Sequence, residues 1–121
     1  MALPKRYRLT SSKEFSQVYK AGRQASTSHL VVKCIESPRE HPNSGCSRFG
    51  ITISHKVSKR AVVRNRLKRQ VRAALQALMP RLHDNLWVVI VLRSSAIECD
   101  YWQILQELEK LFTKLEVCDG Y

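Results

Sequence analysis

The chain has 121 residues, 44% of them hydrophobic, and this length fits one compact domain (residues 1–121) rather than two. Its 21 basic and 10 acidic residues give a net charge of +11, which favours a polyanionic partner. The longest apolar run, residues 86–92, is far shorter than the roughly 20 residues of a membrane-spanning helix, and no signal-peptide pattern opens the chain, so we expect a cytoplasmic protein with no membrane partner.

The positive charge is concentrated in the first part of the chain. Residues 1–72 hold 17 basic and 3 acidic side chains, whereas residues 73–121 hold 4 basic and 7 acidic ones. The basic part is therefore the predicted working surface.

A first helix is predicted over residues 11–21. Ser11 and Glu14 have the spacing of a capping box, and Phe15 and Tyr19 recur at a helical interval. Gly22 is expected to end the helix in a left-handed conformation.

Two strands are predicted next, after a polar turn. Residues 29–35 and 49–54 are rich in apolar and β-branched side chains, as is typical of strands. Residues 36–46 contain two prolines, an asparagine and a glycine, which indicates a flexible loop between them.

A long basic helix is predicted from Ser58 to Met79, with Pro80 beyond its end. Five apolar residues of this helix are spaced by four, four, four and three positions, so they form one stripe that can face a core. They are Val63, Leu67, Val71, Leu75 and Leu78. Eight basic and no acidic residues lie between positions 56 and 72, so nothing local relieves the repulsion between them.

The rest of the chain supplies a strand and a helix. Residues 86–92 form a continuous apolar run, as expected of a central strand buried on both faces. The last helix starts at Asp100, which has capping spacing to Gln103. The order helix, strand, strand, helix, strand, helix predicts an α/β fold, specifically an α+β sandwich with helices packed on a small central sheet.

Neither metal binding nor catalysis by the chain is expected from the pattern. The four cysteines form no Cys-x-x-Cys pair and the four histidines are scattered, so zinc-ligand spacing is absent. We expect reduced thiols, with Cys34 and Cys99 packed inside and Cys118 exposed. No convergent carboxylates that would hold catalytic metals are visible, and His83 with Asp84 is interpreted as a loop pair.

Nucleic acid is the best candidate partner for the basic helix. Arginine forks suit phosphates, and Asn65 between two arginines suits a base edge or a sugar hydroxyl. The charges surround the apolar stripe without aromatic anchors, which disfavours a membrane-surface helix. The open alternatives are a solubilising helix and a generic basic RNA-binding or ribosome-associated protein. A DNA-binding helix-turn-helix is less favoured because strands flank the helix.

The segment from Lys56 to Arg69, KVSKRAVVRNRLKR, closely resembles the Arg-Asn-Arg signature of the bacterial ribonuclease P protein subunit. Arg8-Leu9 before the first helix, Gly22 after it, and the run Arg48-Phe49-Gly50-Ile51 extend the resemblance to roughly residues 5–115. In that family the RNA subunit is the catalyst: it removes the 5′ leader of precursor tRNA by hydrolysis, with Mg²⁺ bound mainly by RNA. The resemblance implies a non-catalytic protein subunit, monomeric and bound 1:1 to that RNA, and a left-handed crossover around the basic helix.

The resemblance also implies two sets of binding residues. Those expected against the RNA subunit are Lys56, Lys59, Arg60, Arg64, Asn65, Arg66, Lys68 and Arg69. Those expected in the cleft for the 5′ leader, between the first helix and the sheet, are Phe15, Tyr19, Lys33 and Arg8. Aromatic rings there would stack bases of any sequence.

Three points qualify this transfer. Phe15 is equally compatible with a core position. Lys33 stands where many relatives have an aromatic residue, so charge should contribute more to leader binding and its salt dependence should be steeper. His55 stands where a lysine is common, which weakens the positive cluster at neutral pH.

Overall fold

The computed structural model describes residues 8–9, 11–36, 47–83 and 85–117. Most of the predicted loop over residues 36–46, and the predictions for Cys118 and Asp84, lie outside them. The elements, in chain order, are α1 (Ser12–Ala21), β1 (Arg23–Ser26), β2 (Leu30–Glu36), β3 (Arg48–Ile53), α2 (Ala61–Leu78), the 3₁₀ turn η2 (Met79–Arg81), β4 (Leu86–Leu92), the 3₁₀ turn η3 (Ser94–Glu98) and α3 (Tyr101–Lys114).

The four strands form one mixed sheet in the order β1-β2-β4-β3. β4 is antiparallel to β2 and parallel to β3, so it is a central strand, and all but one of its residues are buried. This confirms the sequence prediction for residues 86–92. β3 and β4 are parallel neighbours joined through α2, which forms the β-α-β unit on which the expected crossover depends.

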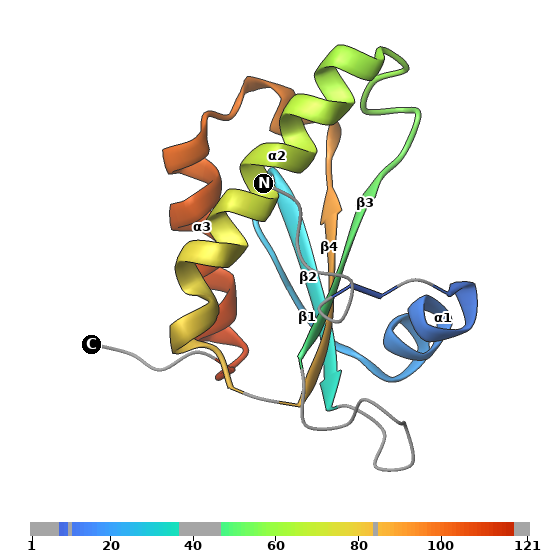
Figure 1. The fold of residues 1–121 in the computed structure, drawn as a ribbon, viewed down its shortest axis with the longest axis vertical. Coiled ribbons are helices and arrows are strands. Elements are labelled where there is room, and N and C mark those ends of the chain that lie inside the picture. The colour runs from blue at the N-terminus through green and yellow to red at the C-terminus, as the bar shows by residue number, and fades with distance from the viewer. Residues whose placement is uncertain (1–7, 10, 37–46, 84, 118–121) are drawn as a thin grey trace.

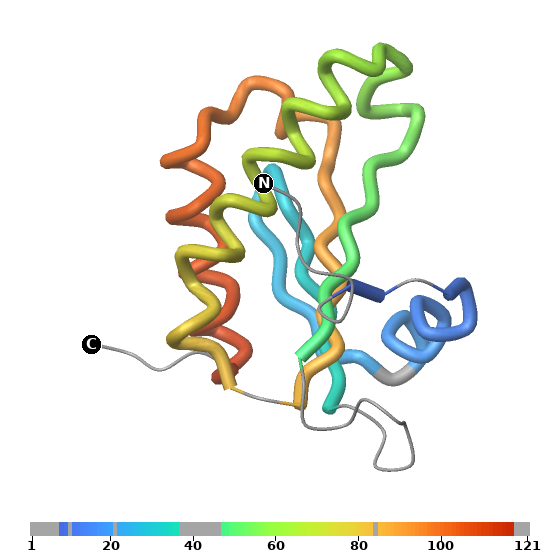
Figure 2. Tube along the Cα trace, viewed as in Figure 1, coloured from blue at the N-terminus to red at the C-terminus, as the bar shows by residue number. Residues whose placement is uncertain are grey.

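The helices lie on both faces of the sheet. Figure 1 shows α2 and α3 together on one face and α1 on the other, beside the lower half of the strands. The tube in Figure 2 shows α2 and α3 running next to each other along that first face. The α+β sandwich is therefore confirmed.

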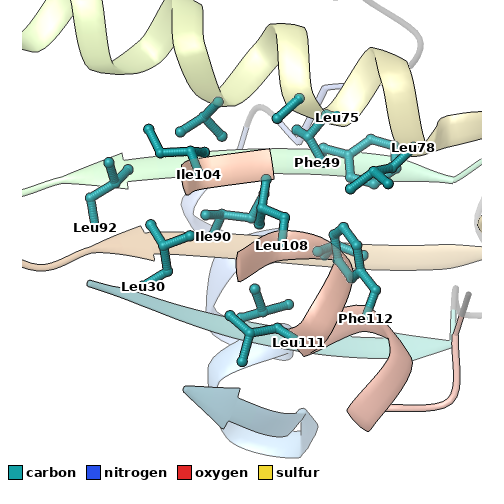
Figure 3. Packing of buried hydrophobic residues seen from close by; sticks show 14 of the residues in the cluster. Leu30, Phe49, Leu75, Leu78, Ile90, Leu92, Ile104, Leu108, Leu111 and Phe112 are labelled. Carbon is teal, nitrogen blue, oxygen red and sulfur yellow. The ribbon is translucent and has the colours of Figure 1, made fainter. Parts of the chain in front are cut away.

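The main core lies between the sheet and the α2/α3 pair. Figure 3 shows side chains from both helices meeting those of the strands, among them Leu75, Ile90 and Leu108. Leu67 and Val71 of the predicted apolar stripe are completely buried. A smaller core under α1 contains Leu9, Val18, Trp87 and Val89.

The capping box of α1 is confirmed, but its predicted ending is wrong. The Ser11 hydroxyl accepts a hydrogen bond from the Glu14 backbone N–H, and the Glu14 carboxylate accepts one from the Ser11 N–H. Gly22 has φ −72° and ψ 142°, which is extended rather than left-handed, because the chain continues straight into β1. Glycine is needed there for space: a Cβ at position 22 would lie 2.3 Å from the Val18 carbonyl oxygen.

Three other element predictions need correction. The polar turn expected before residue 29 contains the strand β1, whose sequence lacks β-branched residues. In the structure only Ala25 of this strand is buried. η3 was not expected either. The basic helix begins at Ala61 rather than Ser58, with Arg60 as an N-cap in extended conformation and no side-chain capping bond. The Ser58 hydroxyl accepts from the Arg60 N–H outside the helix, which stabilises the preceding turn instead.

Candidate nucleic-acid interface

The first turn of α2 presents uncompensated positive charge. It has no acidic residue and no side-chain cap, so its free backbone N–H groups and the positive end of the helix dipole add to the surrounding cations. Lys56, Lys59, Arg60 and Arg69 are all exposed, and so is Asn65. The structure thus places five of the eight residues predicted to contact the RNA subunit on an open surface.

Arg64 is half-buried because it also stabilises the connection between β3 and α2. Its Nη1 donates to the carbonyl oxygens of Ser54 and Ser58, both at 3.1 Å. These bonds fold residues 54–58 against the first turns of the helix. Arg64 therefore positions the neighbouring exposed cations as well as adding its own charge.

Arg66 lies on a different flank of α2 from Arg64. Its Nη2 donates to the carbonyl oxygen of Ile97 in η3 at 2.8 Å. Its Nε is buried and has no hydrogen-bond partner among the described residues. The two arginines of the signature thus hold two different segments against α2.

On the opposite face of the sheet, α1 crosses the strands along one cross-strand row. That row consists of Lys33, Val89 and Gly50, which are paired in register across β2, β4 and β3. The Phe15 ring lies over the row at Gly50, where an added Cβ would come within 2.5 Å of its Cε1 and Cζ. At the β2 end, Lys33 Nζ lies 4.6 Å from the centroid of the Tyr19 ring.

Phe15 and Tyr19 differ in how far they are free to contact a ligand. Phe15 is half-buried and packs against the smaller core, so it contributes both to packing and to the surface. Tyr19 is 42% exposed, and Lys33 occupies a position from which its ammonium contacts the ring. The structure thus brings two of the predicted leader residues, Tyr19 and Lys33, into contact.

The next row of the sheet continues the same face beyond α1. It consists of Val31, Val91 and Thr52, which are paired in register and are all half-buried. Thr52 lies one residue before the end of β3, next to the basic connection that leads to α2. The predicted leader cleft thus has a floor of small and apolar side chains with cations at one end.

A surface hollow of about 160 Å³ at the outer edge of β3 brings the two predicted sets of residues together. Arg8 and Phe15 contribute from the leader set, and Lys68 contributes from the RNA-subunit set. Arg72, which was not selected from the sequence, also lines it. The sequence could have indicated Arg72, because it follows Lys68 by four residues and therefore lies on the same flank of the helix.

A buried ion pair that was not predicted from the sequence holds α1 in place. Arg48 in β3 pairs with the carboxylate of Glu14, and its Nε donates to the Arg8 carbonyl oxygen at 3.0 Å. The guanidinium also lies 5.9 Å from the Trp87 ring centroid. The sequence pattern indicated only a capping role for Glu14.

The other sequence-selected groups lie apart from this surface. Cys34 and Cys99 are free and buried, as predicted, and burial raises the pKa of both thiols. His55 is exposed on the connection between β3 and α2. No helix in the described part of the chain is long and apolar enough to cross a membrane.

Comparisons with known proteins show the family to which the chain belongs. The family model for ribonuclease P matches residues 3–116. The chain is 43% identical to the ribonuclease P protein component of Cyanothece sp., covering 98% of this chain and 99% of that one. It is 44% identical to the component from Microcystis aeruginosa, over 100% of both chains.

Solved structures show the same fold. The RNase P protein of Staphylococcus aureus superposes with a TM-score of 0.81 at 25% identity, covering 93% of this chain and 98% of that one. The Thermotoga maritima RNase P protein, solved in complex with 1-(4-fluorophenyl)-2-thiourea, superposes with a TM-score of 0.74 over 85% of this chain and 94% of that one; at 24% identity it supports the fold alone. The chain belongs to the ribonuclease P protein family, whose members partner the ribonuclease P RNA in maturation of the 5′ end of tRNA.

Proposed function

We propose that this chain binds the RNA subunit through α2 and the preceding connection, and holds the precursor leader on the face of the sheet beside α1. The observation that carries this proposal is the hollow at the β3 edge, where Phe15 and Arg8 meet Lys68 and Arg72. An RNA chain that runs from α2 to the row of Val31, Val91 and Thr52 would pass this edge of the sheet. The leader is thus the ligand expected to contact both residue sets.

The chain contributes no catalytic group in this proposal. Residues 47–83, which include α2 and its connection, contain no acidic side chain, and the carboxylate of Glu14 is paired with Arg48. Mg²⁺ prefers oxygen ligands, chiefly carboxylates and phosphates. The protein surface expected to contact RNA therefore does not fit a Mg²⁺ site, and the catalytic Mg²⁺ is assigned to the RNA subunit.

Cleavage of a precursor tRNA at low Mg²⁺ tests this assignment. The reaction is run with the chain, with a bacterial ribonuclease P RNA, and with both, and the 5′ leader is quantified. We expect cleavage only when the RNA is present, with the chain restoring activity that the RNA lacks at low Mg²⁺. Cleavage by the chain alone would contradict the non-catalytic role, and no effect in any mixture would favour a generic RNA-binding protein.

Binding to the RNA subunit is best tested at exposed cations whose side chains form no hydrogen bond with the described residues. Arg60→Ala with Arg69→Ala should weaken RNA-subunit binding and lower the slope of log K against log salt by about 0.7–0.9 for each phosphate that is no longer neutralised. Lys110→Ala with Lys114→Ala in α3 removes the same charge elsewhere and is the matched control. Equal losses in both pairs would indicate a general charge effect. Titration with a fixed RNA concentration also tests the proposed 1:1 stoichiometry.

Leader binding is tested at the hollow. Lys68→Ala with Arg72→Ala should weaken binding of precursor tRNA more than binding of mature tRNA, each measured with the assembled holoenzyme. Mature tRNA lacks the leader, so the difference between the two losses of affinity reports the contacts made to the leader. Equal weakening of both substrates would place these two cations against the RNA subunit alone.

A further inference from the structure

We propose that His29, Cys99 and Glu107 form a binding site for a divalent transition-metal ion, with Zn²⁺ as the expected occupant. The three residues come from separate parts of the fold: His29 precedes β2, Cys99 follows η3, and Glu107 lies in α3. One ligand atom from each lies within 4.8 Å of the other two. Among the described residues, no other group of three or more histidine, cysteine or acidic side chains is brought together in this way.

The donor set selects the class of metal. A ring nitrogen, a thiolate and one carboxylate oxygen suit Zn²⁺, whereas Mg²⁺ and Ca²⁺ take oxygen ligands. Tetrahedral Zn²⁺ with bonds of about 2.0–2.3 Å places its ligand atoms roughly 3.5 Å apart. Small side-chain rotations that draw the more distant atoms inward by about 1 Å would therefore complete the site.

Neighbouring groups already orient the carboxylate. The Thr27 hydroxyl donates to Oε1 of Glu107, and His29 Nδ1 lies 2.8 Å from Oε2 of the same group. Hydrogen bonds of this kind around a ligand typically fix its orientation and raise its affinity for the metal. The ion would take the place of the contact between His29 Nδ1 and Glu107 Oε2.

The local charge favours a cation even though the chain as a whole is basic. The carboxylates of Glu107, Asp100 and Glu98 all lie near the Cys99 thiol. These carboxylates make the surroundings of Cys99 negative. A dication bound there would be attracted by these carboxylates and would hold Cys99 as the thiolate.

Two of the three proposed ligands are accessible from the surface, and Cys99 lies buried behind them. His29 and Glu107 line an open hollow of about 350 Å³, which provides an entry path and room for a water molecule as the fourth ligand. Lys110 and Lys114 also line this hollow, and both are exposed side chains. They oppose the cation through solvent, whereas Glu107 contacts it directly.

No protein-bound metal was expected from the sequence because the ligands are far apart in the chain. Only the fold brings position 29 to positions 99 and 107. The site also has a consequence for the basic helix, because it fixes the end of η3, two residues after the Ile97 carbonyl that accepts from Arg66. Metal binding would therefore stabilise the backbone segment that accepts the hydrogen bond from Arg66. The metal-site proposal itself does not depend on the proposal about RNA binding.

Cobalt substitution tests the site spectroscopically in the full chain. Cys46→Ala and Cys118→Ala are introduced first, so that Cys99 and the buried Cys34 are the remaining thiols. Addition of Co²⁺ to this metal-free protein should produce a thiolate-to-cobalt charge-transfer band and tetrahedral visible bands, with one ion per chain. Zn²⁺ should displace Co²⁺ stoichiometrically. Cys99→Ser and His29→Gln should each weaken binding at least tenfold, and His55→Gln, an exposed histidine elsewhere, should not.

Thermal unfolding separates ligand loss from damage to the fold. Zn²⁺ should raise the Tm of the parent protein relative to the same protein with EDTA, and should leave the Tm of His29→Gln unchanged. Absence of the thiolate band, binding that survives Cys99→Ser, or binding that disappears with Cys46 and Cys118 would each overturn the proposal.

Discussion

Arg48 and Glu14 form a buried ion pair that joins the edge strand β3 to α1. Their side chains are almost completely shielded, at 6% and 8% exposure for the two residues. Replacing one partner of such a pair leaves the other charge buried and typically costs about 3–5 kcal/mol. We therefore expect Arg48→Met to lower the free energy of unfolding by about that amount, measured by urea denaturation.

A double-mutant cycle provides the control for this pair. Arg48→Met combined with Glu14→Gln removes both charges, so the loss should be smaller than the sum of the two single losses. Additive losses would show that the two side chains do not stabilise each other. Precursor affinity of the same variants should fall if the pair also orients α1, because Phe15 and Tyr19 are carried by that helix.

The contact between Lys33 and Tyr19 leads to a prediction about leader binding. Tyr19→Ala should weaken binding of precursor tRNA by about 1–3 kcal/mol, the usual value for one stacked base, and should leave mature tRNA unaffected. Tyr19→Phe keeps the ring and should bind normally. Lys33→Met keeps a long side chain but should lower the salt slope of precursor binding by about 0.7. An unchanged slope would exclude a phosphate contact at Lys33.

Two glycines are expected to respond differently to the addition of one methyl group. At Gly50 the new Cβ meets the Phe15 ring, the far end of a side chain that can rotate. At Gly22 it meets the backbone carbonyl of Val18, which cannot move without disturbing the end of α1. Gly22→Ala should therefore lower the free energy of unfolding by more than Gly50→Ala, for which overpacking predicts about 1–3 kcal/mol.

The double variant Gly50→Ala with Phe15→Leu checks the cause of the Gly50 effect. A smaller side chain at position 15 makes room for the methyl group, so the free energy of unfolding should recover. Precursor binding should be weak in this double variant, because the Phe15 ring is absent. If stability does not recover, the ring is not the obstacle. Urea denaturation and precursor affinity are measured on the same preparations.

The pKa of the Cys34 thiol predicts a loss of stability at alkaline pH. Burial raises this pKa, and the nearby charge and hydrogen bond of Arg23 partly oppose the rise. The folded state therefore holds the thiol proton more tightly than the unfolded chain, so stability is greatest below the unfolded pKa of about 8.5 and declines as pH rises towards the folded value. Cys34→Ala should flatten this decline. Arg23→Gln should raise the thiol pKa further and slow alkylation of Cys34 at pH 9.

Much of the fold follows from local patterns in the sequence. The apolar run of β4 and the stripe of α2 were both recognisable because each element must bury a particular set of side chains. The capping bonds at Ser11 and Asp100 depend only on neighbouring residues, and the Asp100 carboxylate does accept from the Gln103 N–H at 2.8 Å. β1 was missed because it is held by pairing with β2 rather than by its own composition.

The site was less predictable than the fold because its contacts join distant parts of the chain. The signature identified α2 as basic, but not that Arg64 and Arg66 each bind a different backbone segment. The pairing of Arg48 with Glu14 spans 34 positions, and the Lys33 contact with Tyr19 depends on how α1 crosses the sheet. Such relationships are properties of tertiary packing and have no local signal.

The uncapped first turn of α2 makes the free protein and its complex respond to ionic strength in opposite directions. In the free protein, cations crowd the positive end of a helix dipole and repel one another, so added salt screens this repulsion and favours the folded chain. In the complex the same cations attract phosphate, and added salt weakens that attraction. Conditions that best preserve the isolated subunit are therefore those in which it holds its RNA least tightly.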